Sequence, residues 1–470
     1  MKKTLKALII LSSCMMLLCA CRQDPTPEPI PENITFKSKI PVVMTGTEAE
    51  ITNTFRTDYF RGDACVMDKD LALLSIAHAR CDASVNLTAM RFDNLEKYEN
   101  TGSNSDPDKC TYCFGHRSVD GYDLIVVVLE YIDYDVEWAG NLTIGNKETG
   151  KRSDHRGFDL ATEWLYGKLK EYVGKNYNDS RLKFWITGYS RGGDLTDVLT
   201  CKIIERNEFN VRQSDIYAYA FEASSIIDAD YVHEYQCIHN IVVDSDIIAA
   251  IPPAIEDWGL ARPGSDVILK GDPDTINKGL KELAGDGASM PVFTQEEGEY
   301  NYSTPAEFLA VFLDILAEKG LDPVEGAASL RSREVFYETV QARMTYLLEL
   351  ATKDNMKVLR IMEEEIKAYY NEKGAIGLLS LLAQDGLYNF AKPILIKNQI
   401  EFVDDELKEG CSLVYSLAIN TNLTTPLMSL LLDTSSPTYI NTAHMDNLKY
   451  IVTSHYPAVI YVLVKDYAGK

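Results

Sequence analysis

Residues 184–204 read F-W-I-T-G-Y-S-R-G-G-D-L-T-D-V-L-T-C-K-I-I and contain the pattern G-x-S-x-G, with Ser190 at its centre. The run from Phe184 to Thr187 is apolar and β-prone, which is typical of a buried strand. The residues after the glycines place apolar side chains at helical spacing, namely Leu195, Val198, Leu199 and Ile203. This stretch predicts a strand, a sharp turn and a helix, the context in which G-x-S-x-G presents a reactive serine. A glycine-rich turn without chemistry is the alternative.

Strand and helix patterns alternate around this stretch. An uninterrupted apolar run at 124–129 is typical of a strand covered on both faces, and residues 155–173 have the apolar spacing of a helix. Two further strands are expected at 216–220 and 238–243, whereas residues 35–120 combine a helical stretch with polar loops. This alternation predicts an α/β fold, a mainly parallel sheet wrapped by helices, with the functional face at the carboxyl ends of the strands.

A serine hydroxyl becomes a useful nucleophile only when a base removes its proton and an acid orients that base. In α/β-hydrolases these groups follow the order Ser, Asp or Glu, His. The apolar strand at 238–243 leads into Asp244 and Asp246, which both qualify as the acid. Five of the seven histidines precede this acid, which leaves His444 and His455. We expect His455, because it precedes a proline-started amphipathic segment, and keep His444 as the alternative.

Several segments between about residues 65 and 270 resemble the class 3 (fungal-type) lipase family and its bacterial relatives. The family elbow G-H-S-x-G-G is matched by G-Y-S-R-G-G, and D-I-V-P-x-L-P-P is matched by D-I-I-A-A-I-P-P, which begins at Asp246. His155-Arg-Gly-Phe resembles the family's H-x-G-F. The resemblance implies an α/β-hydrolase fold and a Ser190, Asp246 and His455 triad that cleaves carboxylic esters, most of all acylglycerols. It implies no metal and no organic cofactor.

The oxyanion hole should combine the backbone N–H of Arg191 with a donor from the loop after the strand at 124–129. We place that second donor near Tyr131. The family usually has Arg-Gly-Thr there, whereas this chain has Glu130-Tyr131-Ile132, and Tyr189 replaces the usual histidine beside the serine. These departures support an alternative, a non-catalytic lipoprotein that binds lipid or glycan on a decayed hydrolase scaffold. A third possibility keeps the triad but uses a phospholipid or a plant-polymer ester.

The amino-terminal residues are typical of an exported lipoprotein. Lysines precede an apolar run, and L-C-A-C ending at Cys21 resembles a bacterial lipobox. We therefore expect a signal peptide at 1–20, a lipid on Cys21 and a Pro-rich tether at 21–34, which would anchor the protein to a membrane of the bacterial cell envelope. Ordinary secretion with cleavage elsewhere is the alternative.

The rest of the chain divides into a predicted hydrolase core at 35–270, a helical insertion or cap at 271–435 and a segment at 436–470 that completes the core. Helices that merely extend the core are the alternative to a cap. The formal net charge of −24 argues against a nucleic-acid partner. Cys110 and Cys113 form a lone C-x-x-C for which a local disulfide or buried thiols are expected rather than zinc. The pattern predicts no oligomeric state.

Overall fold

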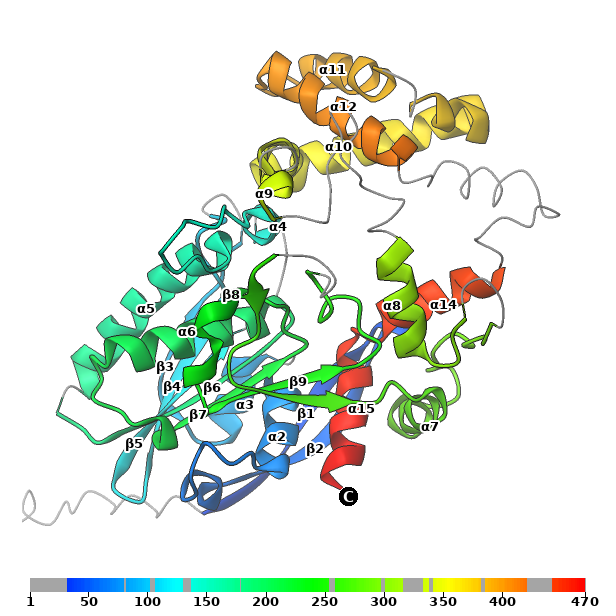
Figure 1. The fold of residues 1–470 in the computed structure, drawn as a ribbon. Helices are drawn as coiled ribbons and strands as arrows, with labels where there is room; N and C mark the ends of the chain where they lie inside the picture. The colour runs from blue at the N-terminus through cyan, green and yellow to red at the C-terminus, as the bar shows by residue number, and fades with distance from the viewer. Residues whose placement is uncertain are drawn as a thin grey trace, which may run out of the picture.

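A seven-stranded sheet forms the centre of the computed structural model, in the order β11-β9-β7-β6-β5-β4-β3 (Figure 1). The structure describes residues 32–79, 82–101, 106–129, 137–177, 179–252, 258–296, 301–315, 333–337, 341–381, 385–420 and 442–469. The five strands from β5 to β11 run parallel, and β4 and β3 are antiparallel to their neighbours. The strands span β3 Asp93–Tyr98, β4 Tyr112–Val119, β5 Tyr122–Leu129, β6 Leu182–Tyr189, β7 Ile216–Phe221, β9 Ile238–Val243 and β11 Ser265–Leu269.

Helices cover both faces of this sheet. On one face α2 (Lys69–Ala79) packs beneath β6, where Trp185 Nε1 donates a hydrogen bond to Ser75 Oγ at 2.9 Å. On the other face α5 (Arg156–Asn176) and α6 (Arg191–Arg206) pack together, and Phe184 meets Phe209 just beyond α6. Successive side chains of β6 thus enter two different layers of the core, which explains why the whole strand is buried. The predicted α/β-hydrolase fold is confirmed.

The amino-terminal hairpin is a feature that the sequence analysis missed. Strands β1 (Asn33–Val42) and β2 (Thr47–Arg56) pair with each other and lie outside the central sheet. Their burial alternates residue by residue, and the inward side chains, including Ile40 and Phe55, join the main core. The expectation of loops at the start of the chain was therefore wrong for this hairpin and for β3 and β4.

The carboxyl-terminal helix α15 (Pro457–Ala468) closes the same core. It packs against α2, α7 (Pro273–Ala284) and β1, and its residues from Pro457 to Val464 are buried. Because α7 contributes Ile276 and Leu280 to the main core, the core continues past the boundary expected at residue 270.

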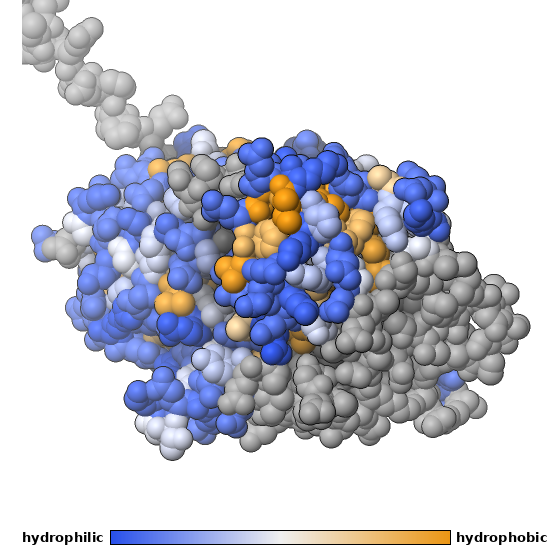
Figure 2. Space-filling model, turned by 90° about the horizontal axis from the view of Figure 1, so that it is seen from above, coloured by the Kyte–Doolittle hydropathy of each residue, from blue (hydrophilic) through white to orange (hydrophobic). Residues whose placement is uncertain are grey.

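The remaining helices lie beyond the sheet. Within the predicted helical insertion, residues 342–380 form one long helix, α10 (Ala342–Ser380), which packs with α11 (Gly386–Lys397) and α12 (Asp404–Asn420). Figure 1 shows these three helices as a layer above the core. Where the described residues form the surface seen from above, it is mainly hydrophilic, with hydrophobic residues gathered near its middle (Figure 2). Whether this layer works as a cap stays a prediction.

Among the described residues, the helical region contacts the core near residues 137–154. The Arg333 guanidinium in α9 (Arg333–Phe336) is buried and donates to the backbone carbonyls of Ile144, Gly145, Ser153 and Asp154. Helix α10 also packs against α4 (Glu137–Leu142), the first described element after β5. Helix α8 (Pro305–Ile315) instead packs on α14 (Thr442–Thr453).

Several predictions concern cysteines and the amino terminus. Cys110 and Cys113 are buried and are not joined by a disulfide, so the buried-thiol alternative holds. The signal peptide, Cys21 and nearly all of the tether lie outside the described residues. Within the described residues, no helix combines the length and the apolar character needed to span a membrane.

Candidate active site

Ser190 lies at the turn between β6 and α6, at the carboxyl edge of the sheet. Its backbone has φ 56° and ψ −125°, a conformation that a non-glycine residue rarely adopts. The buried strand β6 before Ser190 and the buried start of α6 after it hold the residue in this strained conformation. The Ser190 N–H also donates to Phe221 O at 2.8 Å. Ser190 therefore has the strained strand-to-helix geometry of a nucleophile elbow.

The glycines of the elbow are needed because backbones pass very close to one another. A Cβ added at Gly188 would lie 2.0 Å from Gly192 O, and one at Gly192 would lie 2.4 Å from Leu129 O. Any side chain at these positions would force β5, β6 and the start of α6 apart. The G-x-S-x-G spacing thus reflects a steric requirement of this turn.

Asp246 and His455 form one hydrogen-bonded chain with Ser190. His455 Nε2 lies 2.8 Å from Ser190 Oγ, and His455 Nδ1 lies 2.6 Å from Asp246 Oδ2. The Asp246 side chain is completely buried, while that of His455 is 17% exposed. Burial would raise the pKa of Asp246, but the charge of His455 and hydrogen bonds to the carboxylate hold this pKa below its usual value.

The alternative acid and base candidates occupy different surroundings. Asp244 Oδ1 accepts a hydrogen bond from the Gly271 N–H at 2.7 Å, so its carboxylate serves the turn between β11 and α7. His444 lies in α14, and its side chain is outside the described residues. Of the candidates raised by the sequence, the structure thus brings Asp246 and His455 to Ser190.

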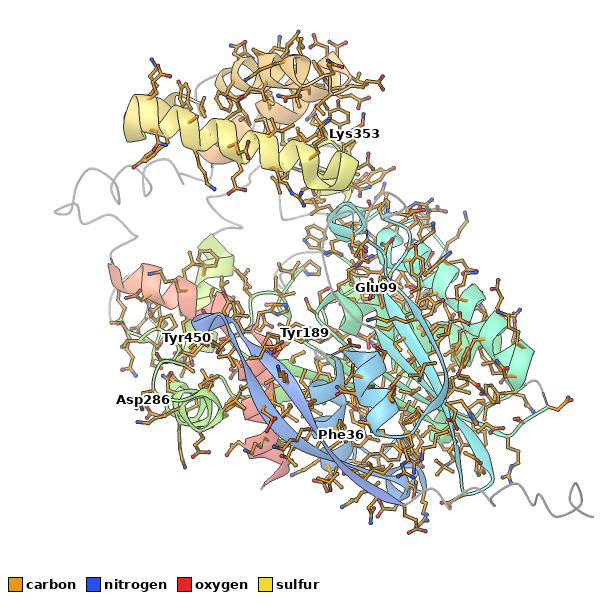
Figure 3. The ribbon with its side chains drawn as sticks, turned by 180° about the vertical axis from the view of Figure 1, so that it is seen from behind. Phe36, Glu99, Tyr189, Asp286, Lys353 and Tyr450 are labelled. Carbon is orange, nitrogen blue, oxygen red and sulfur yellow. The ribbon has the colours of Figure 1, made fainter. Side chains whose placement is uncertain are left out.

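The short loop between α14 and α15 that contains His455, the histidine loop, is attached to its surroundings by side-chain hydrogen bonds. The Tyr189 hydroxyl donates a hydrogen bond to the His455 carbonyl oxygen, and the buried hydroxyls of Ser245 and Ser454 lie 2.9 Å apart. The Tyr450 hydroxyl donates to Gly271 O at 3.1 Å. Figure 3 places Tyr189 in the interior of the molecule, well below the helical layer that contains Lys353. These bonds join the elbow, the acid loop and the histidine loop.

We expect Tyr189→Phe to lower kcat by about 5–10-fold with little change in KM, because it removes one hydrogen bond that positions the histidine loop. Steady-state hydrolysis of a soluble ester measures both constants. Tyr172→Phe is the matched control, since its hydroxyl also donates to a backbone carbonyl, Asn94 O at 3.0 Å, but lies in α5 away from the site. An unchanged kcat in Tyr189→Phe would contradict the positioning role.

Arg191 follows the nucleophile as the first residue of α6, so its backbone N–H has no acceptor within the helix. This N–H and the positive end of the helix dipole fit the predicted oxyanion donor. Tyr131, the predicted second donor, lies outside the described residues.

The Arg191 side chain makes a buried ion pair that the sequence analysis did not foresee. Arg191 Nε donates to Glu137 Oε2 at 2.8 Å, and the two side chains are 1% and 5% exposed. Asn100 Nδ2 also donates to Glu137, at 3.0 Å. Helix α4 is therefore joined to the start of α6 beside the nucleophile.

His155 and Gly157, from the H-x-G-F segment, fix α4 from the other side. His155 Nε2 lies 3.0 Å from Asn141 O, and burial lowers the pKa of His155 to about 3, so the ring is neutral. A Cβ at Gly157 would lie 1.9 Å from Gly140 O, which shows that α4 and α5 are in backbone contact. The H-x-G-F segment therefore holds α4 against α5.

We expect Glu137→Gln to lower the free energy of unfolding by about 3–5 kcal/mol, because it leaves the buried Arg191 charge without its partner. The double variant Arg191→Met/Glu137→Met should recover most of this loss, since no buried charge remains. Urea denaturation measures all three proteins. Glu50→Gln is the control, because the Lys37–Glu50 pair is 66% and 57% exposed and its loss should cost under about 1 kcal/mol. A full-sized loss in the double variant would contradict this account.

Among the described residues, one group of side chains could hold a metal ion: Glu222, Asp246 and His455, whose potential ligand atoms lie within 4.8 Å of one another. His455 Nδ1 already bonds Asp246, and the buried Glu222 carboxyl lies beside the Asp246 carboxyl. A proton shared by two acids accounts for this close approach. The arrangement therefore requires no metal. Sequence reasoning missed Glu222, and no motif could have indicated it.

The fold and the elbow define an α/β-hydrolase scaffold with a serine at its nucleophile position. The family model of class 3 lipases matches residues 136–256, a segment that includes Ser190 and Asp246. This match supports a lipase-type hydrolase. A search of curated proteins found no match.

Solved structures of lipases are similar to part of the chain. A triacylglycerol lipase whose catalytic centre is a serine protease triad is 17% identical, with 46% of this chain and 80% of that chain covered and a TM-score of 0.34. The Rhizomucor miehei triacylglyceride lipase is 19% identical, with 42% and 77% covered and a TM-score of 0.32. A lipase from Rhizopus microsporus var. chinensis is 14% identical, with 52% and 80% covered and a TM-score of 0.30.

Proposed function

We propose that this protein is a serine hydrolase that cleaves carboxylic esters, with lipid esters such as acylglycerols as its substrate class. The observation that carries the proposal is the hydrogen-bonded chain from Asp246 through His455 to Ser190, located at a strained elbow. The class 3 lipase match over residues 136–256 supports the lipid part of the proposal.

The reaction follows from these positions. Ser190 Oγ attacks the ester carbonyl while His455 Nε2 takes its proton, and the Arg191 N–H stabilises the oxyanion. His455 then gives the proton to the departing alcohol, which leaves an acyl group on Ser190. Water attacks this acyl-enzyme with His455 again as base, which releases the carboxylic acid and restores the serine. Asp246 keeps His455 oriented and stabilises its charged form.

Covalent labelling tests the proposal against a decayed, non-catalytic scaffold. A fluorophosphonate probe should label the folded protein at Ser190, because only an activated serine attacks the phosphorus. Peptide mapping by mass spectrometry identifies the labelled residue, and heat-denatured protein is the control. Absence of label at Ser190 in the folded protein would support the binding-protein alternative.

A series of esters then identifies the substrate class. Hydrolysis rates on p-nitrophenyl esters of increasing acyl length, on triacylglycerol emulsions and on phospholipid vesicles should be highest for acylglycerols. A preference for phospholipids or for short plant-polymer esters would replace the lipase proposal with another esterase activity.

We also propose that a lipid on Cys21 anchors the protein to a membrane of the bacterial cell envelope. The lipobox-like L-C-A-C and the Pro-rich residues after it motivate this proposal. In the bacterial host, the parent should partition into detergent on Triton X-114 phase separation, and a Cys21→Ser variant should not. Equal partitioning of both proteins would contradict the anchor.

A further inference from the structure

Glu222 is a buried acid beside the candidate triad to which the mechanism above assigns no task. It follows the last residue of β7 and is completely buried. The Glu222 N–H donates to Ile241 O at 3.0 Å, which ties this residue to β9. The Val243 N–H, at the end of β9, lies 3.2 Å from each oxygen of the Glu222 carboxyl. Glu222 is therefore held rigidly where β7 and β9 end.

The Glu222 side chain lies beside Asp246. The two carboxyls are both buried, and an oxygen of each lies within 4.8 Å of the other and of a His455 nitrogen. Two ionised carboxylates buried this close together would repel each other strongly. One of the two acids must carry a proton.

The surroundings decide which acid carries it. Asp246 Oδ2 lies 2.6 Å from His455 Nδ1, and Asp246 Oδ1 accepts a hydrogen bond from the Ile248 N–H at 2.8 Å. Both contacts favour the ionised form of Asp246. Glu222 receives the Val243 N–H, with Arg262 as its other charged neighbour. Burial, followed by the nearby charge of Asp246, raises the pKa of Glu222 well above its ordinary value. Arg262 is occupied by an ion pair with Asp266.

We infer that Glu222 is a positioning residue that stays neutral and donates a hydrogen bond to the Asp246 carboxylate, which holds this carboxylate in the orientation that His455 requires. The inference rests on the proposed hydrolase function. It adds a second acid to the relay, so that Asp246 is fixed by His455, the Ile248 N–H and Glu222 together. It also keeps the net charge of the acid pair at −1, because only Asp246 is ionised.

Two substitutions distinguish a role of the hydrogen-bond donor at position 222 from a role of the side-chain volume alone. Glu222→Gln keeps a neutral side chain that can donate to Asp246 and accept from Val243, so kcat should stay within about threefold of the parent. Glu222→Leu keeps the approximate volume but cannot donate, and kcat should fall about 100-fold with KM unchanged, since Asp246 would lose its alignment. Asp197→Asn is the control, because Asp197 is a completely buried acid of α6 whose pKa is also raised by burial.

The pH profile and infrared spectra complete the test. The acid limb of kcat/KM should lie at the same pH in Glu222→Gln as in the parent, because no charge is removed. A limb displaced to lower pH would show that Glu222 was ionised and would overturn the inference, as would a Glu222→Leu variant with the kcat of the parent. The difference infrared spectrum, parent minus Glu222→Gln, should contain the band of one protonated carboxyl beyond those of other buried acids such as Asp197, and its absence from the difference would also overturn the inference. This band needs no turnover, so it tests the proton on Glu222 even if Ser190 fails to label.

Discussion

Replacing Ser190 by alanine should lower kcat for ester hydrolysis by about 10⁶-fold, because no other group can form the acyl-enzyme. The elbow places Oγ 2.8 Å from His455 Nε2, and alanine removes only this oxygen. KM should change little, since the hydroxyl contributes to the transition state rather than to substrate binding. The thermal unfolding midpoint should stay close to that of the parent, because the backbone strain at residue 190 is unchanged.

The measurement is the hydrolysis of p-nitrophenyl esters at saturating substrate, with thermal unfolding followed on the same samples. Ser118→Ala is the matched control, because Ser118 is exposed on β4 and its partner in the sheet, Asp123, lies at the opposite end of β5 from the elbow. Hydrolysis by Ser190→Ala at the rate of the parent would end the proposal of a serine hydrolase.

The elbow could be predicted from sequence because its constraints are local. Gly188, Gly192 and the serine lie within five residues, and the steric contacts that require the glycines involve the adjoining strand and helix. The parallel sheet was also predictable, since strands buried on both faces have uninterrupted apolar sequences, as β5 does. The fold class therefore followed from short segments of sequence.

The hairpin β1–β2 shows where this reasoning fails. Its strands alternate polar and apolar residues, but Pro41 and the short, interrupted apolar pattern weaken the signal. The two strands are held by side chains that enter a core built from α2 and α15, and α15 ends the chain. No local signal can report a partner that lies about 400 residues away.

The side chains that surround the candidate triad were equally hidden. Glu222 follows an ordinary buried strand, and no motif marked Glu137. Each residue matters because of the charged side chain beside it. Glu222 lies beside Asp246, and Glu137 forms an ion pair with Arg191. Each contact joins residues from different elements, so it depends on the completed fold. Chain order and elimination left Asp244 or Asp246 and His444 or His455 as candidates, and the family resemblance implied Asp246. Neither could identify the groups that orient them.

His455→Ala should lower kcat by about 10⁵–10⁶-fold, nearly as much as the loss of the serine, because the two groups act as one unit. His444→Ala is the matched control and should retain the kcat of the parent, since the structure places the imidazole of His455 between Ser190 and Asp246. The same ester assay measures both variants.

The double variant Ser190→Ala/His455→Ala makes this prediction sharper. Independent contributions would multiply the two losses, whereas a shared proton transfer predicts that the double variant is no slower than either single variant. Without the serine, His455 has no proton to accept, and without His455 the hydroxyl stays protonated and unreactive. A large loss of kcat in His444→Ala, combined with normal activity in His455→Ala, would mean that His444 is the base. Multiplying losses in the double variant would instead mean that His455 acts on the substrate separately from Ser190.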